Sequence, residues 1–114
     1  MKLLIVEDNP SVRRVIRSIV DTIADEIYEC EDGVDALPAY VSHKPDWVLM
    51  DLAMKHVNGI EATRLIKDQY PDARVIIVTN FDEVDLRESA LKAGACGYVL
   101  KENLLELRRL LQDM

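Results

Sequence analysis

The chain has 114 residues, of which 49% are hydrophobic and 31% are charged, and its formal net charge is −7. This composition is typical of one folded domain with a single core and excludes a disordered segment. The negative charge argues against direct binding to nucleic acid, since phosphate backbones require basic surfaces. The sequence contains no apolar run of membrane-spanning length and no signal peptide, so we expect a cytoplasmic protein without membrane contact.

The N-terminal half alternates short apolar runs with helical patterns. The run at 2–6 predicts a strand, and Asn9-Pro10 is a typical helix start that precedes apolar residues at helical spacing. A second short strand is predicted at 27–30, followed by a turn and a helix near 35–42. A third apolar run then ends at Asp51.

The C-terminal half repeats this alternation. A helix is predicted from Gly59 to just before Tyr70, and a fourth strand at 74–78. The next helix, at 82–93, is closed by Gly94. A fifth strand is expected at 97–100, and a leucine-rich helix, with one or two leucines exposed, from 103 onward.

The alternation predicts a single α/β domain over residues 1–114 with (βα)5 architecture. Right-handed crossovers then give a doubly wound, flavodoxin-like parallel sheet of strand order 2-1-3-4-5. Three polar residues are predicted to cap helices because each precedes a helical pattern: Asp35, Asp82 and Asn103.

Polar side chains stand at the end of four of the five predicted strands: Glu7 and Asp8, then Asp51, Thr79 and Lys101. In open parallel sheets, ligands bind at the carboxyl ends of the strands. Taken singly, each of these residues is well explained as a solvated loop residue. Together they favour a functional site.

In the expected strand order, Glu7, Asp8 and Asp51 converge, and three carboxylates packed together repel one another. A divalent cation removes this conflict, and a small set of hard oxygen ligands suits Mg²⁺. Lys101 can hold a phosphoryl oxygen, and the Thr79 hydroxyl can bind another. The set therefore fits the formation of an aspartyl phosphate.

Six segments of the sequence form a pattern that, taken together, is highly specific for one protein family: 4–8, 32–37, 48–52, 58–62, 78–79 and 93–101. Through them the whole chain resembles the receiver domain of response regulators in two-component signalling. The resemblance implies a phospho-accepting switch rather than an enzyme, with Mg²⁺ as cofactor. It implies the following site residues: Asp51 as phospho-acceptor, Glu7, Asp8, Asp51 and the backbone carbonyl of Ala53 at the metal, Lys101 at the phosphoryl group, and Thr79 with Tyr98 as the switch pair.

The same resemblance implies partners. The phosphoryl donor would be a sensor histidine kinase or a histidine phosphotransfer protein. The surface of the fourth helix, fifth strand and fifth helix would contact a second copy or an effector domain. No direct contact of this chain with nucleic acid is expected.

Three residues depart from the usual receiver pattern: Lys55 and Glu102 replace prolines, and Asn80 replaces a small residue beside the phosphoryl site. The Lys-Glu pair at 101–102 resembles the receivers of regulators with a LuxR-type helix-turn-helix domain. Asn80 is expected to crowd the phosphoryl site.

Two other enzyme or cofactor-binding classes fit less well. A haloacid-dehalogenase-type phosphatase needs a second aspartate two residues after the nucleophile, where this chain has Ala53. A flavodoxin needs a Ser/Thr/Gly-rich phosphate loop after the first strand, where Glu7 and Asp8 would repel phosphate. A receiver-like module that is never phosphorylated is the remaining alternative, against which the complete set of site residues argues.

Arg13, Arg14 and Arg17 form a basic cluster on the first predicted helix. They are interpreted either as a docking surface for the phosphodonor or as a solvated helix face. Cys30 and Cys96 are expected near opposite edges of the sheet, too far apart for a disulfide, as two reduced and partly buried thiols.

Overall fold

A computed structural model describes residues 1–113 as a parallel five-stranded sheet of order β2-β1-β3-β4-β5. The strands are β1 Lys2–Val6, β2 Glu26–Cys30, β3 Trp47–Asp51, β4 Val75–Thr79 and β5 Gly97–Leu100. The α-helices are α1 Pro10–Val20, α2 Ala36–His43, α3 Gly59–Gln69, α4 Val84–Ala93 and α5 Glu106–Asp113. The predicted flavodoxin-like order is confirmed.

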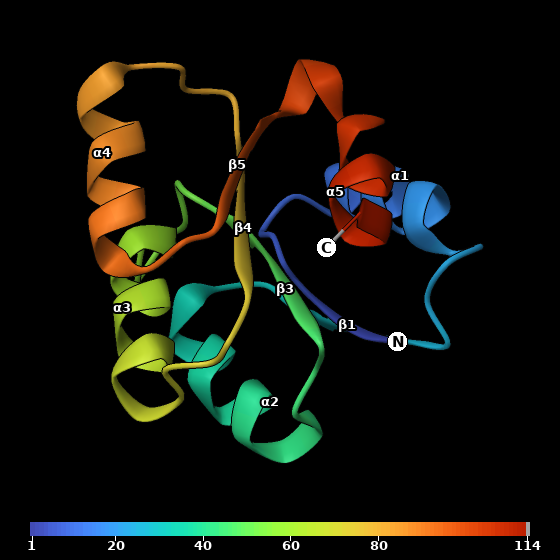
Figure 1. Cartoon of the computed structure of the whole chain (residues 1–114), viewed down its shortest axis with the longest axis horizontal. Helices are drawn as coiled ribbons and strands as arrows, with labels where there is room; N and C mark the ends of the chain where they lie inside the picture. Colours follow the sequence, from blue (N-terminus) through green and yellow to red (C-terminus); the bar gives the residue numbers. More distant parts are fainter. Residues whose placement is uncertain (114) are drawn as a thin grey trace.

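Helices cover both faces of the sheet (Figure 1). Helices α1 and α5 lie together on one face, where Ile16 and Leu107 pack on the sheet in one buried cluster. Helices α2, α3 and α4 cover the other face, where Ile66 and Ala90 belong to a second cluster. The central strands β3 and β4 are buried along their whole length, as expected for a sheet covered on both faces.

Several predicted helix boundaries are confirmed by their capping groups. The Asn9 side chain accepts hydrogen bonds from the backbone N–H groups of Ser11 and Val12, and so satisfies donors that the helix leaves free. Helix α4 ends at Gly94, whose φ of 109° lies in the left-handed region that favours glycine.

Of the three predicted helix caps, Asp35 is confirmed as the N-cap residue of α2, whereas Asp82 and Asn103 are wrong. Asp35 stands before α2 but makes no capping hydrogen bond, because a 3₁₀ turn at Gly33–Asp35 precedes the helix. Asp82 instead pairs with Arg87, and α4 begins at Val84. The chain passes through a second 3₁₀ turn at Lys101–Asn103, so that α5 starts at Glu106, beyond Asn103.

The two cysteines are free thiols, as predicted. Cys30 is half-buried, and burial raises the pKa of its thiol to about 11. Cys96 is exposed rather than partly buried, because it lies in the connection before β5. Among the predicted leucines at the C-terminal end, Leu105 is the exposed one, at 71%.

Candidate functional site

The acid site forms where β1 and β3 run side by side. Val6 pairs with Met50 in the parallel register, so the residues that follow them, Glu7 and Asp51, emerge next to each other. Glu7 is 1% exposed and Asp51 is 4% exposed, whereas Asp8 is exposed to solvent. One carboxylate oxygen from each of these three residues lies within 4.8 Å of the other two.

Lys101 brings a positive charge to the two buried acids from the end of β5. Its Nζ atom lies 2.9 Å from Oε1 of Glu7 and 3.2 Å from Oδ1 of Asp51. The Lys101 ammonium is thus a close ionic partner of Glu7 Oε1, which accepts no other hydrogen bond of regular geometry among the described residues. The other oxygen, Oε2, accepts the Asn9 backbone N–H at 3.2 Å.

The titration behaviour of the site follows from burial and from these neighbours. Burial raises the pKa of Glu7 to about 7; the Asp51 charge adds to this, and Lys101 opposes it. Burial likewise raises the pKa of Asp51 against the opposing effect of Lys101. For Lys101, burial alone would lower the pKa, but Glu7 and Asp51 together raise it. One ammonium group thus faces more negative charge than it can balance.

A hard divalent cation fits this arrangement. The cluster offers carboxylate oxygens only, its two buried acids share one ammonium group, and Asp8 opens it to solvent. Mg²⁺ prefers such a donor set and completes its shell with waters or phosphate oxygens. Ala53 lies on the exposed connection that follows β3; the role of its carbonyl remains a prediction.

The predicted switch residues are linked through the backbone of one residue, Phe81. Thr79 is fully buried at the end of β4, and its Oγ1 accepts the backbone N–H of Phe81 at 3.2 Å. The Tyr98 hydroxyl donates to the carbonyl oxygen of Phe81 at 2.6 Å. The Arg87 guanidinium lies 4.6 Å from the centre of the Tyr98 ring and is held by Asp82 at 2.6 Å. Both hydroxyls therefore bind the same connection between β4 and α4.

No functional role is predicted for Asp32 from its sequence context, yet its side chain is nearly buried, at 7% exposure. Its carboxylate accepts the backbone N–H groups of Val34 at 3.0 Å, His56 at 2.8 Å and Val57 at 3.1 Å. The signal that could have found it is an Asp-Gly pair directly after an edge strand, at the same edge of the sheet as the acids. Asp32 also lines a cleft of about 410 Å³ together with Asp8, Glu31, Lys55 and His56.

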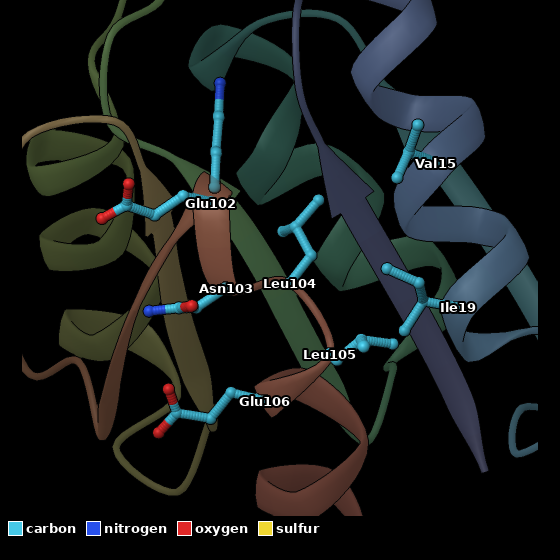
Figure 2. Close-up of a pocket in the computed structure, with 8 residues that line it drawn as sticks. Val15, Ile19, Glu102, Asn103, Leu104, Leu105 and Glu106 are labelled. Atoms are coloured by element: carbon cyan, nitrogen blue, oxygen red, sulfur yellow. The ribbon is translucent and has the colours of Figure 1, made fainter.

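The three departures from the usual pattern lie at the rim of the site. Lys55 is exposed and lines the cleft that contains Asp8. Asn80 is exposed and lines a groove with Ser11, Val12 and Lys101, and the expected crowding of the phosphoryl group stays a prediction. Glu102 belongs to a groove of about 460 Å³, in which Val15 and Ile19 of α1 face Leu104 and Leu105 (Figure 2).

The arginine cluster on α1 divides into two parts. Arg13 is largely buried, because its guanidinium donates to the backbone oxygen of Glu7 at 2.7 Å and pairs with Glu29 at 3.3 Å. Arg17 pairs with Glu29 as well, at 2.8 Å, and Arg14 is exposed. Arg13 therefore has a structural role beside the acid site. The docking role of the cluster stays a prediction.

Comparison with known proteins places this chain and its fold in a family. The family model for the response regulator receiver domain matches residues 3–112. The chemotaxis protein CheY of Halobacterium salinarum is 36% identical over 88% of this chain and 83% of its own length. The crystal structure of a LuxR-family two-component response regulator from Aurantimonas sp. SI85-9A1 has a TM-score of 0.91 and 32% identity, and the match covers 98% of this chain and 82% of that chain.

Other relatives are longer. The transcriptional regulatory protein DegU of Brevibacillus brevis is 34% identical over 90% of this chain, but the match covers only 44% of DegU. The chain thus spans about half the length of this and other transcriptional regulators that it matches. Within the described part, it has no helix both long and apolar enough to cross a membrane. The chain belongs to the response regulator receiver domains of two-component systems.

Proposed function

We propose that the chain is a phospho-accepting receiver in which Asp51 takes a phosphoryl group from a phosphohistidine, in a reaction that depends on Mg²⁺. The donor is a sensor histidine kinase or a histidine phosphotransfer protein, and the reaction takes place in the cytoplasm. The observation that carries the proposal is the buried Asp51 carboxylate beside Glu7, with Lys101 Nζ at 3.2 Å. All of residues 1–114 form the receiver unit.

The transfer is a displacement at phosphorus. A carboxylate oxygen of Asp51 forms the new P–O bond while the P–N bond to the donor imidazole breaks, and the imidazole nitrogen keeps the electron pair. Lys101 already contacts Asp51 and is placed to hold a phosphoryl oxygen as a point charge. A Mg²⁺ ion held by Glu7, Asp8 and Asp51 would supply charge neutralisation for the phosphoryl oxygens. The product stays on the chain, so the protein is a switch rather than an enzyme with a released product.

The signal would leave the site through Thr79. Its hydroxyl binds the backbone of Phe81, and a turn toward the phosphoryl group would release that N–H. The connection that anchors the Tyr98 hydroxyl would then shift, which changes the surface of α4, β5 and α5. This surface carries Val84 at 68% and Leu91 at 59% exposure, which supports contact with an effector domain or a second copy.

The decisive experiment is chemical. With a small phosphodonor such as phosphoramidate and Mg²⁺, intact-mass spectrometry should detect one added phosphoryl group that is lost in base. Asp51→Asn should abolish this addition. The matched control Asp68→Asn removes an exposed acid from α3 and should label like wild type. Equal labelling of Asp51→Asn and wild type would refute the assignment.

The metal is tested separately. Glu7→Gln and Asp8→Asn should each weaken Mg²⁺ binding, measured by isothermal titration calorimetry, by about 10-fold or more, since each removes one charged ligand. The control Glu88→Gln removes an exposed acid from α4 and should bind Mg²⁺ like wild type. Unchanged Mg²⁺ titration in both site variants would mean that this acid pair is not the metal site.

A further inference from the structure

We propose that Asp32 is a positioning residue for the acid site. By holding residues 53–57 in place, its carboxylate sets the affinity of the neighbouring acids for their divalent cation. The inference rests on the proposed function, because it assigns a further residue to the same metal-dependent reaction. Asp32 is not one of the three clustered acids, so it acts through the backbone and not as a ligand.

The first observation is how this loop is held. In the part of the chain that the structure describes, the backbone of residues 53–57 makes no hydrogen bond to another backbone group. Two of its N–H groups, those of His56 and Val57, are satisfied by the Asp32 carboxylate at 2.8 and 3.1 Å. Hydrogen bonds to an ionised carboxylate are about twice as strong as neutral ones. One buried side chain therefore replaces the secondary structure that the loop lacks.

The hydrogen bonds that the Asp32 carboxylate accepts from the N–H groups of His56 and Val57 form a clamp on the loop. The second observation is a backbone contact beside this clamp. A Cβ atom added at Gly33 would lie 2.3 Å from the carbonyl oxygen of Val57, so the two loops touch through their main chains. The neighbouring Asp32 is itself fixed, because its Oδ1 also accepts the Val34 N–H of the 3₁₀ turn at Gly33–Asp35. The clamp thus ties residues 53–57 to a short ordered turn rather than to a free chain.

The third observation links the loop to the site. The loop starts directly after Asp51 and closes on itself where the Gly59 N–H donates to the Leu52 carbonyl oxygen at 2.8 Å. A Cβ atom at Gly59 would lie 2.0 Å from the Asp51 carbonyl oxygen, so the end of the loop also packs closely against the backbone of Asp51. Asp32 and Asp8 also line the same cleft. Movement of the loop therefore displaces the groups around Asp51.

The clamp requires a carboxylate rather than an amide. Burial opposes ionisation of Asp32, but the three backbone N–H groups outweigh it and lower its pKa to about 2. The charged clamp is therefore present throughout the neutral range. In Asp32→Asn, Oδ1 could still accept from Val34 and Val57, whereas the new NH₂ group would face the N–H of His56. This variant breaks one bond of the clamp, and Asp32→Ala breaks all of them.

The test uses Asp32→Asn, Asp32→Ala and the control Asp35→Asn. Asp35 lies on the same turn and carries the same charge, but its side chain makes no capping hydrogen bond. Mg²⁺ affinity is measured by calorimetry, and the phosphorylation rate is measured over a range of Mg²⁺ concentrations. Asp32→Ala should weaken Mg²⁺ affinity about 10- to 100-fold, as loss of groups that orient metal ligands usually does. Asp32→Asn should lose less, and Asp35→Asn should match wild type.

The dependence of the phosphorylation rate on Mg²⁺ concentration separates the positioning role from a purely structural role. The positioning role raises the Mg²⁺ concentration for half-maximal rate while the rate at saturating Mg²⁺ changes less. Amide NMR shifts on substitution should be largest at His56 and Val57. Wild-type Mg²⁺ affinity in folded Asp32→Asn and Asp32→Ala, or an equal loss in Asp35→Asn, would overturn the proposal. If Asp32→Ala does not fold, Asp32→Asn decides. If wild type itself neither binds Mg²⁺ nor labels at Asp51, the proposed function fails as well.

Discussion

The two loops that flank the acceptor strand are anchored by different chemistry. The connection after β3 is held by the ionised Asp32 carboxylate and by the backbone contact at Gly33. The connection after β4 is held by two neutral hydroxyls, Thr79 Oγ1 on the Phe81 N–H at 3.2 Å and Tyr98 OH on the Phe81 carbonyl oxygen at 2.6 Å.

This difference matches what the proposed phosphorylation switch would require from each loop. Charge-assisted bonds are costly to break, so the loop beside the proposed metal site is fixed before any ligand arrives. A neutral hydrogen bond contributes only about 1 kcal/mol and is easily exchanged for one to a phosphoryl oxygen. The molecule thus has a fixed side and an adjustable side, on either side of Asp51.

The largest expected effect comes from breaking the fixed side at Gly33. Gly33→Ala places a Cβ atom 2.3 Å from the Val57 carbonyl oxygen, which forces two backbones apart. We expect a loss of about 3 kcal/mol in the free energy of unfolding, at the upper end for overpacking. Urea unfolding measures this. Gly97→Ala is the control, because its Cβ would meet side-chain atoms, the nearest on Ile76 at 3.2 Å, and no backbone atom is among its nearest neighbours; a similar loss there would contradict the assignment.

The next effect is the acid dependence of Asp32. Its pKa in the folded protein is lowered from 3.8 to about 2, so its stabilisation is present above about pH 4 and is lost as the pH falls through 2. At pH 7, Asp32→Asn should lower the free energy of unfolding by about 2 kcal/mol, the value of a hydrogen bond to a charged group. The gap between wild type and variant should close toward pH 2. A gap that stays constant from pH 6 to pH 2 would mean that the carboxylate charge is not what holds the loop.

On the adjustable side, Thr79→Ala and Tyr98→Phe should each cost about 1 kcal/mol in the free energy of unfolding, since each removes one neutral hydrogen bond. Thr79→Ala should still accept a phosphoryl group, but its Tyr98 ring should no longer respond. NMR of the Tyr98 ring before and after phosphorylation measures this. The same ring shift in wild type and Thr79→Ala would show that Thr79 does not transmit the signal.

The smallest effect concerns the Arg87 guanidinium, which lies 4.6 Å from the centre of the Tyr98 ring. Arg87→Gln should cost about 0.5 kcal/mol, the value of an exposed cation–π contact. It should also move the Tyr98 ring resonances in the unphosphorylated protein, because the ring loses a partner. Arg109→Gln is the control, since among the described residues it breaks the pair with Glu106 on α5 and leaves Tyr98 untouched. Equal Tyr98 shifts in both variants would rule out a specific bracing role.

The strand order and the meeting of the acids were predictable because they depend on local patterns and on one topological rule. Apolar runs that end in polar residues place those residues at one edge of a parallel sheet. The N-cap position of Asp35 was predictable, but the roles of Asp82 and Asn103 were not, because a cap signal cannot tell a helix start from a 3₁₀ turn or a nearby ion pair.

The missed features share another property. Asp32 binds residues more than 20 positions away, and Arg13 pairs with Glu29 on a neighbouring strand. Such contacts depend on how loops from different strands meet in space, which no short sequence window contains. An Asp-Gly pair is typical of a turn, and the turn alone is a sufficient explanation for Asp32. The sequence therefore gives no sign of its hydrogen bonds to His56 and Val57.

Lys101 also has a consequence for the order in which the chain folds. It follows β5, the last strand in the sequence, which pairs only with β4 among the described residues. Until that strand docks, the acids at the ends of β1 and β3 have no ammonium group beside them, and burying an unpaired charge is costly. A chain that emerges from the ribosome therefore completes its sheet and balances its central charges in a single late event.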